Sequence, residues 1–269
     1  MRPVRRPLAR CLLAGVTFWA APSAFAGHDP AGARELIARV LAARQTSGYR
    51  VRARLVRTTP GAEQPDVKQL LIKGRREGDD SKVLYQILWP VPLAGQTVVI
   101  EKTAGRNVHA WMFTPPDRVA PLNPLGSGDA FFGSDLTIED LAEEFWHWPA
   151  QEIVGEDTVG QRRCKILESR PSAETATSYS LVRTWIAPDI ALPLLIEEFG
   201  KDGKLAKHIT AARITQRRND DWTAANVIIE PADGRTRTVL EGSHADRDID
   251  IPDADFTLEQ IKATLRPSP

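Results

Sequence analysis

Alternation between apolar and polar residues, repeated in many short segments, constrains this chain more than any other feature of its sequence. The clearest case is segment 49–56, where every second residue from Tyr49 to Leu55 is apolar and the residues between them are arginines. A period of two is typical of a β-strand with one buried face and one wet face, so we expect the arginines to point into water. About five such segments lie between residues 49 and 113, and about six more lie between residues 151 and 243.

The turns between these segments predict how the strands pair. Gly200-Lys201-Asp202-Gly203 and Pro231-Ala232-Asp233-Gly234 are strong hairpin turns, and residues 104–107 form another turn. Parallel pairing needs long crossover connections, so these short turns favour an antiparallel meander. The sequence therefore predicts a mainly β (α+β) fold.

Four other segments depart from the strand pattern. Residues 31–45 carry apolar side chains at helical spacing, and a second helix is expected after a capping box of Thr137 and Asp140. Residues 115–133 contain four prolines, which predicts a loop of the kind that often carries function. Residues 256–265 are expected to form a short helix or turn.

The N-terminus predicts export across a bacterial inner membrane. Four arginines precede a short apolar run at residues 11–21, and Ala24-Phe25-Ala26 has the small-residue pattern of a cleavage site. We expect residues 1–26 to be a signal peptide cleaved after Ala26, which leaves residues 27–269 as a single domain in the periplasm. The apolar run is too short for a stable bilayer span, and an uncleaved anchor is the alternative.

Charge and cysteine content argue against two classes of protein. The full chain has 35 basic and 35 acidic residues, and cleavage after Ala26 would remove four arginines and no acids. Nucleic-acid-binding proteins favour a basic patch, which this sequence does not supply, so no nucleic-acid partner is expected. Cys164 would be the one remaining cysteine, so no internal disulfide can form and we expect a small buried residue there.

The sequence lacks the common motifs that carry catalysis or bind metal. It has no His-Glu-x-x-His pair, no Cys-x-x-Cys pair, no phosphate-binding glycine loop and no Gly-x-Ser-x-Gly turn. Acidic residues crowd segment 135–144, where paired carboxylates would suit acid–base chemistry, but acids at a helix N-terminus are the simpler interpretation. We therefore predict no catalytic residue, no metal site, no cofactor and no enzymatic activity.

Several motifs, in order along the chain, resemble one family. Segment 132–141 reads Phe132-Gly133-Ser134-Asp135-Leu136-Thr137-Ile138-Glu139-Asp140-Leu141. It is similar to the Gly-Ser-Asp-aromatic-Ser-aromatic-Glu-Asp-Leu segment of the outer-membrane lipoprotein-sorting-like family, in the LolA/LolB-like superfamily, with Leu136 and Ile138 in place of the usual aromatic residues. Leu192-Pro193-Leu194 and segments 198–205 and 248–257 resemble the Leu-Pro-Leu turn, the next hairpin and the closing segment of that family.

The resemblance covers residues 31–265 and implies both a fold and a function. The family fold is a half-open antiparallel β-barrel, here expected to have about eleven strands, with helices covering its concave face. Members carry lipoprotein acyl chains or other lipids through the periplasm, and relatives often accompany RND/MMPL-type exporters. We therefore expect a monomeric periplasmic carrier that binds a lipid or lipoprotein acyl chain in a hydrophobic cavity and moves it towards the outer membrane.

The cavity lining is predicted from the apolar faces of the first strand series and from the segment around the second helix. Burial of an acyl chain contributes roughly 25 cal/mol per Å² of surface removed from water, so binding needs no covalent chemistry. The helix from Ile138 to Phe145 and the 115–133 loop are expected to form a lid. The expected ligand-binding residues are Val51, Leu55, Tyr85, Ile87, Trp89, Val98, Ile100, Trp111, Phe113, Phe131, Phe132, Leu141 and Phe145.

Two other functions stay open from the sequence. A periplasmic adaptor of an RND/MMPL-type exporter, with no ligand of its own, is favoured if the cavity is filled by the protein's own side chains. A secreted hydrolase would need a nucleophile and a base within hydrogen-bond reach, and the sequence offers no motif for such a pair.

Overall fold

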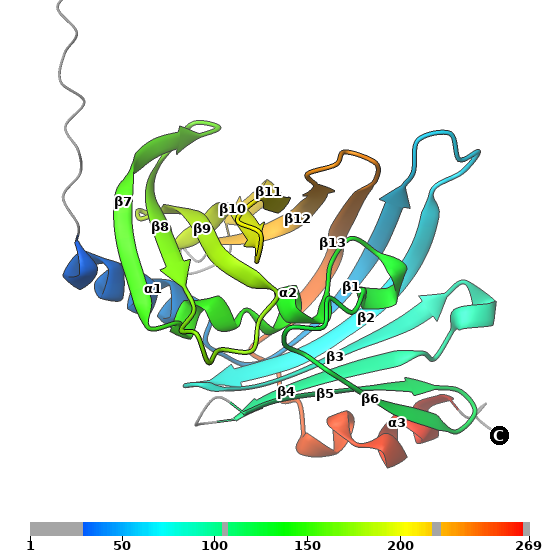
Figure 1. The fold of residues 1–269 in the computed structure, drawn as a ribbon. Coiled ribbons are helices and arrows are strands. Elements are labelled where there is room, and N and C mark those ends of the chain that lie inside the picture. The colour runs from blue at the N-terminus through cyan, green and yellow to red at the C-terminus, as the bar shows by residue number, and fades with distance from the viewer. Residues whose placement is uncertain (1–28, 104–106, 217–221, 266–269) are drawn as a thin grey trace, which may run out of the picture.

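The computed structural model describes residues 29–103, 107–216 and 222–265, and Figure 1 shows the fold. The expected signal peptide, its cleavage site after Ala26 and residues 104–106 of an expected turn lie outside the described residues. Within the described ranges, no helix has the length and apolar character needed to cross a membrane.

Thirteen strands of the described chain form one antiparallel sheet. The first series is β1 (Thr46–Thr58), β2 (Asp66–Glu77), β3 (Asp80–Trp89), β4 (Thr97–Thr103), β5 (Asn107–Thr114) and β6 (Arg118–Leu122), with the short helix η1 (Val91–Leu93) between β3 and β4. The second series is β7 (Ala150–Val159), β8 (Arg162–Arg170), β9 (Tyr179–Ala187), β10 (Leu192–Gly200), β11 (Leu205–Gln216), β12 (Trp222–Pro231) and β13 (Arg237–Arg247).

The sheet is curved and open, because β6 and β7 are its two edges in the order β6-β5-β4-β3-β2-β1-β13-β12-β11-β10-β9-β8-β7. The prediction of a mainly β, antiparallel fold is confirmed, whereas the count of about eleven strands is wrong. One additional strand, β6, lies inside segment 115–133, which the sequence predicted as a loop. Pro121 interrupts its pattern, and the sheet tolerates a proline there because β6 is an edge strand.

Pairing between β1 and β13 joins the two strand series in the middle of the sheet. Leu55 lies opposite Leu240 in this pairing, and both side chains belong to the apolar inner face. On the outer face, the guanidinium of Arg50 lies 3.1 Å from the carboxylate of Asp246 across the same two strands. The predicted exposure of the β1 arginines is confirmed.

The connection from β6 to β7 crosses the concave side of the sheet, because these strands are its opposite edges. We call residues 123–149 the crossing segment; it contains η2 (Phe131–Gly133), α2 (Ile138–Ala142) and η3 (Glu144–His147). The predicted capping box is confirmed, since Thr137 and Asp140 each accept a hydrogen bond from the other's backbone N–H. The helix ends three residues before Phe145, because Glu143 adopts a left-handed conformation with φ of 52°.

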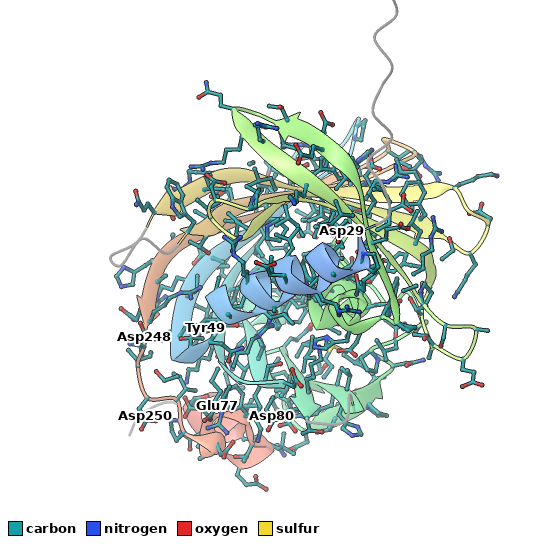
Figure 2. All side chains as sticks on the ribbon, turned by 90° about the vertical axis from the view of Figure 1, so that its left-hand side faces the viewer. Asp29, Tyr49, Glu77, Asp80, Asp248 and Asp250 are labelled. Atoms are coloured by element: carbon teal, nitrogen blue, oxygen red, sulfur yellow. The ribbon has the colours of Figure 1, made fainter. Side chains whose placement is uncertain are left out.

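Helix α1 (Pro30–Ala43) confirms the first predicted helix and lies across the opening at one end of the sheet (Figure 2). Asp29 caps it by accepting a hydrogen bond from the backbone N–H of Gly32. Its buried face, which includes Leu36 and Val40, packs against β7–β9 and against Phe145 of the crossing segment. The apolar periodicity of residues 31–45 therefore corresponds to the face of α1 that is buried in the structure.

The C-terminal tail packs on the opposite, convex side of the sheet. After η5 (Asp253–Phe256), helix α3 (Leu258–Leu265) places Ile261 in an apolar cluster with Val99 and Phe113 (Figure 1). Residues on either side of Val99 belong instead to the inner cluster, as strand alternation requires. Strands β3–β5 are thus apolar on both faces, and α3 does not cover the concave face as the resemblance implied for the helices.

The tail reaches that side by passing closely over Gly48 of β1. The backbone N–H of Ile249 donates to the Gly48 carbonyl at 3.2 Å, and a Cβ on Gly48 would lie 2.4 Å from the Ile249 carbonyl oxygen. Glycine is needed here because two backbones approach more closely than any side chain allows.

We expect Gly48→Ala to lower the free energy of unfolding by about 1–3 kcal/mol, because backbone must shift to admit the methyl group. Urea unfolding followed by circular dichroism measures the change. Gly155→Ala is the matched control, since a Cβ there meets its nearest neighbour, Ile166, at an ordinary 3.7 Å. Equal stability of the two variants would contradict the close approach at Gly48.

Candidate functional site

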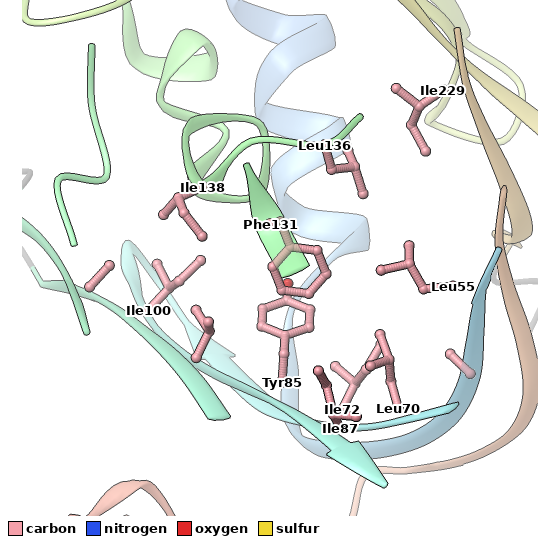
Figure 3. Close-up of a cluster of buried hydrophobic side chains, with 13 residues drawn as sticks. Leu55, Leu70, Ile72, Tyr85, Ile87, Ile100, Phe131, Leu136, Ile138 and Ile229 are labelled. Carbon is pink, nitrogen blue, oxygen red and sulfur yellow. The ribbon is translucent and has the colours of Figure 1, made fainter. Parts of the chain in front are cut away.

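The concave side of the sheet divides into a filled region and an open cavity. The filled region lies over β2–β4, where the crossing segment inserts its own apolar side chains (Figure 3). Phe131 is fully buried, and its ring contacts that of Tyr85 edge-on with centroids 5.0 Å apart. Leu136 and Ile138 extend the same cluster. This half of the predicted ligand site is therefore packed as a core.

Most of the predicted lining residues belong to that filled region. They share the inner face of β1–β4 or the crossing segment: Leu55, Tyr85, Ile87, Val98, Ile100 and Phe131 are buried in the cluster, while Val51, Phe132 and Leu141 are partly buried against it. Phe145 lies in the neighbouring cluster with α1. Strand alternation thus placed these side chains on the correct side of the sheet.

Three predicted lining residues lie elsewhere. Phe113 and Trp111 point to the convex face, where Phe113 packs against the α3 cluster. Trp89 ends β3 and remains 47% exposed. On β5 the inner positions belong to Ala110 and Met112, so the large aromatic residues occupy the face that the tail helix covers. The prediction failed here because both faces of β5 are apolar.

The open cavity has a volume of about 610 Å³ and lies beside the filled region, against β1–β3 and β11–β13. This size falls within the range of small-molecule sites, roughly 300–1,000 Å³. Val51 is the predicted residue that lines it. The other apolar lining residues include Tyr49, Ala53, Ile72, Val83, Val227 and Leu240. Tyr49 and Ala53 share the alternating face of Val51, which is the signal that would have added them.

Arginines surround a single glutamate at the end of this cavity nearest to α1. Arg44 donates to Glu143 Oε2 at 2.6 Å, and Arg76 Nη2 lies 3.8 Å from the same oxygen. Burial by itself raises the pKa of Glu143, but the charges of Arg44 and Arg76 outweigh it and hold that pKa below its usual value. Glu143 is therefore an ionised counterion inside the cavity wall.

Comparison with solved structures supports the fold assignment. A DUF1329 family protein from Desulfovibrio piger superposes with a TM-score of 0.77 at 20% identity, over 86% of this chain and 98% of that one. A domain described as outer membrane lipoprotein-sorting, from Vibrio parahaemolyticus, gives 0.78 at 18% identity over the same shares. A LolA superfamily protein from Nitrosomonas europaea gives 0.65 at 17% identity, over 85% and 98%.

Sequence comparison adds the family. A protein-family model, described as that of an uncharacterized protein, matches residues 79–263, which is more than half of the chain. The chain belongs to the LolA-like family. No curated protein sequence matches it.

In this LolA-like chain, the acidic residues of segment 132–141 fasten the crossing segment to the sheet. Asp140 accepts hydrogen bonds from Lys207 Nζ at 2.7 Å and from the Tyr179 hydroxyl at 2.5 Å. Asp135 accepts from the hydroxyls of Thr236 and Thr238, each at 2.7 Å. The sequence analysis explained these acids as residues at a helix N-terminus, which holds for Asp140. It missed their hydrogen-bond partners on the sheet, because residues far apart in sequence give no local signal.

The same buried network contains Glu198 of β10. Its Oε2 atom lies 3.7 Å from Lys207 Nζ, and its side chain is 1% exposed. Burial and the neighbouring carboxylate of Asp140 raise the pKa of Glu198 well above its usual value, although the charge of Lys207 opposes them. Asp140 is the nearer partner of Lys207, at 2.7 Å, and it is hydrogen-bonded to the ammonium. The described residues contain no group of three or more His, Cys, Asp or Glu side chains placed to hold a metal ion.

We expect Glu198→Gln to stabilise the protein above the raised pKa of Glu198 and to leave stability unchanged in acid. A carboxyl with a raised folded-state pKa adds stability that is complete below its unfolded pKa, about 4.3, and is lost as pH rises through the folded value. Thermal melting across a pH series measures the difference between wild type and variant.

Glu230→Gln, which changes a half-exposed carboxylate on β12, is the matched control for the loss of one carboxylate from the sheet. A constant difference between Glu198→Gln and wild type at every pH would mean that the pKa of Glu198 is the same in the folded and the unfolded protein, and would contradict the raised value.

Proposed function

We propose that this LolA-like protein is a non-enzymatic periplasmic carrier that holds the acyl chain of a lipid or lipoprotein and moves it towards the outer membrane. The observation that carries the proposal is the cavity of about 610 Å³ that the crossing segment leaves open on the concave side. Its apolar wall includes Val51, Ile72, Val227 and Leu240. The fold shared with a lipoprotein-sorting domain supports the same function.

Burial of the chain supplies the binding energy in this mechanism. Each Å² of apolar surface removed from water contributes roughly 25 cal/mol, so an acyl chain binds and leaves without bond formation. The crossing segment acts as a lid at the edge of the cavity, with Glu143 as its contact residue. Asp135 and Asp140 fasten it to strands β11 and β13, and these polar anchors fix where the lid rests.

We expect Val51→Trp to reduce lipid occupancy at least tenfold, because an indole in the cavity wall takes up the space of the chain. Native mass spectrometry of protein purified gently from the periplasm, followed by lipid extraction, measures the occupancy. Val91→Trp is the matched control, because Val91 is 79% exposed in η1 and lies outside the cavity lining. Equal lipid content in both variants would exclude this cavity as the site.

Export is the second part of the proposed function. We expect the protein recovered from the periplasm to begin at Gly27, because the sequence provides a cleavage site after Ala26. N-terminal sequencing of that protein checks the position. Recovery of the uncleaved chain in the membrane fraction would instead support an N-terminal anchor.

A second candidate function is an adaptor that docks on an inner-membrane RND/MMPL-type exporter and carries no ligand. Two observations favour it: Phe131 and its neighbours fill part of the concave side, and the large exposed apolar residues of the described chain gather near β3–β6. Those exposed residues are Trp89, Val91, Val119 and Leu265. A clean ligand-free mass, with no uptake of added phospholipid or lipopeptide, would select the adaptor.

A further inference from the structure

The polar part of the cavity wall carries a strong excess of positive charge. Among the described residues that line it, five are arginines and one, Glu143, is acidic. The arginines are Arg44, Arg75, Arg76, Arg213 and Arg247. Five guanidinium groups against one carboxylate give the cavity wall a net positive charge, which favours an anionic ligand over an uncharged one.

These arginines do not all serve the fold in the same way. Arg75 donates to the carboxylate of Asp253 at 2.7 Å, so an acidic residue of the C-terminal tail neutralises its charge. The partners of Arg213 are neutral, since it donates to the Asn226 side chain and to the Gly242 carbonyl. Arg44 and Arg76 share the one carboxylate of Glu143.

The remaining arginine, Arg247, stacks on Tyr49 in the same cavity wall. The guanidinium of Arg247 lies over the Tyr49 ring, 5.6 Å from its centroid. A Cβ on Gly74 would come within 2.5 Å of the Tyr49 hydroxyl oxygen, so the glycine lets the phenol lie flat across β2. Burial raises the pKa of this phenol, and the charges of Arg76 and Arg247 oppose the rise. These guanidinium groups therefore act on one shared space around Tyr49, which Figure 2 labels near the end of α1.

We propose that the carried ligand is an acidic amphiphile, whose chain lies on the apolar wall and whose anionic group meets Arg44, Arg76 and Arg247. This inference rests on the proposed carrier function and adds the chemical class of the headgroup. Guanidinium groups bind phosphate and carboxylate through paired, charge-assisted hydrogen bonds, which strengthen where water is scarce. Glu143 pairs with Arg44 and Arg76 and therefore competes with that group for them.

The test compares two probes with the same chain, hexadecyl phosphate and the uncharged hexadecyl glucoside, by titration calorimetry below their micelle concentrations. We expect the wild type to bind the phosphate about tenfold more tightly or better, since each lost charge-assisted contact weakens binding by about that factor. Arg76→Gln should abolish the preference. Glu143→Gln should strengthen phosphate binding and leave glucoside binding unchanged, because it removes the competing carboxylate.

A loss of phosphate affinity in Arg76→Gln and a gain in Glu143→Gln cannot both arise from a general loss of folding. If Arg76→Gln does not fold, Arg247→Gln repeats the test. Arg163→Gln is the control, because Arg163 is 85% exposed on β8 and lies outside the cavity lining.

Equal binding of both probes by the wild type would overturn the headgroup inference and leave the carrier function intact. Binding of neither probe would overturn the carrier as well. Inorganic phosphate that competes as strongly as hexadecyl phosphate would assign the arginines to a free anion and overturn the amphiphile.

Discussion

The pairing of the first strand with the last is the interaction on which the rest of this structure depends. Because β1 pairs with β13, the two strand series grow outward from the middle of one sheet and end at opposite edges. The chain must span the sheet to pass from β6 to β7, and it does so along the concave side. A long connection across the sheet therefore accompanies this strand order, and its apolar side chains fill part of the concave side.

The crossing segment meets the sheet through two kinds of contact with different physical roles. Phe131 and Ile138 bury apolar surface and supply most of the stabilisation. Asp135 and Asp140 add little net energy, because burying a paired charge nearly cancels its attraction. They do specify position, since the Lys207 and Thr238 partners satisfy them in one placement of the segment. The segment thus has a defined resting place next to an unfilled space.

The sequence predicted the sheet and its helices well, because period-two alternation and capping boxes are local signals. It predicted the burial of Cys164, which is 1% exposed, because free cysteines are usually buried. It failed where two faces of one strand are both apolar, as at Phe113, because only the position of α3 decides which face is inner. It also missed Arg76 and Glu143 as cavity residues, because a charged residue that lines a cavity has no sequence pattern that distinguishes it from a charged surface residue. Of the predicted lining residues, Val51 alone adjoins the open space described here.

An open sheet also has ends on which another chain can build. Each free edge presents unpaired N–H and C=O groups that invite a further strand, from a second copy or from an unfolded chain. The outer edge strand β6 is five residues long and contains Pro121, which has no N–H to donate. At the other edge, Asp29 forms a bridge with Ile153 of β7. Pro121, which made segment 115–133 look like a loop in the sequence, thus also leaves the β6 edge without one N–H donor, and this disfavours the addition of a further strand there.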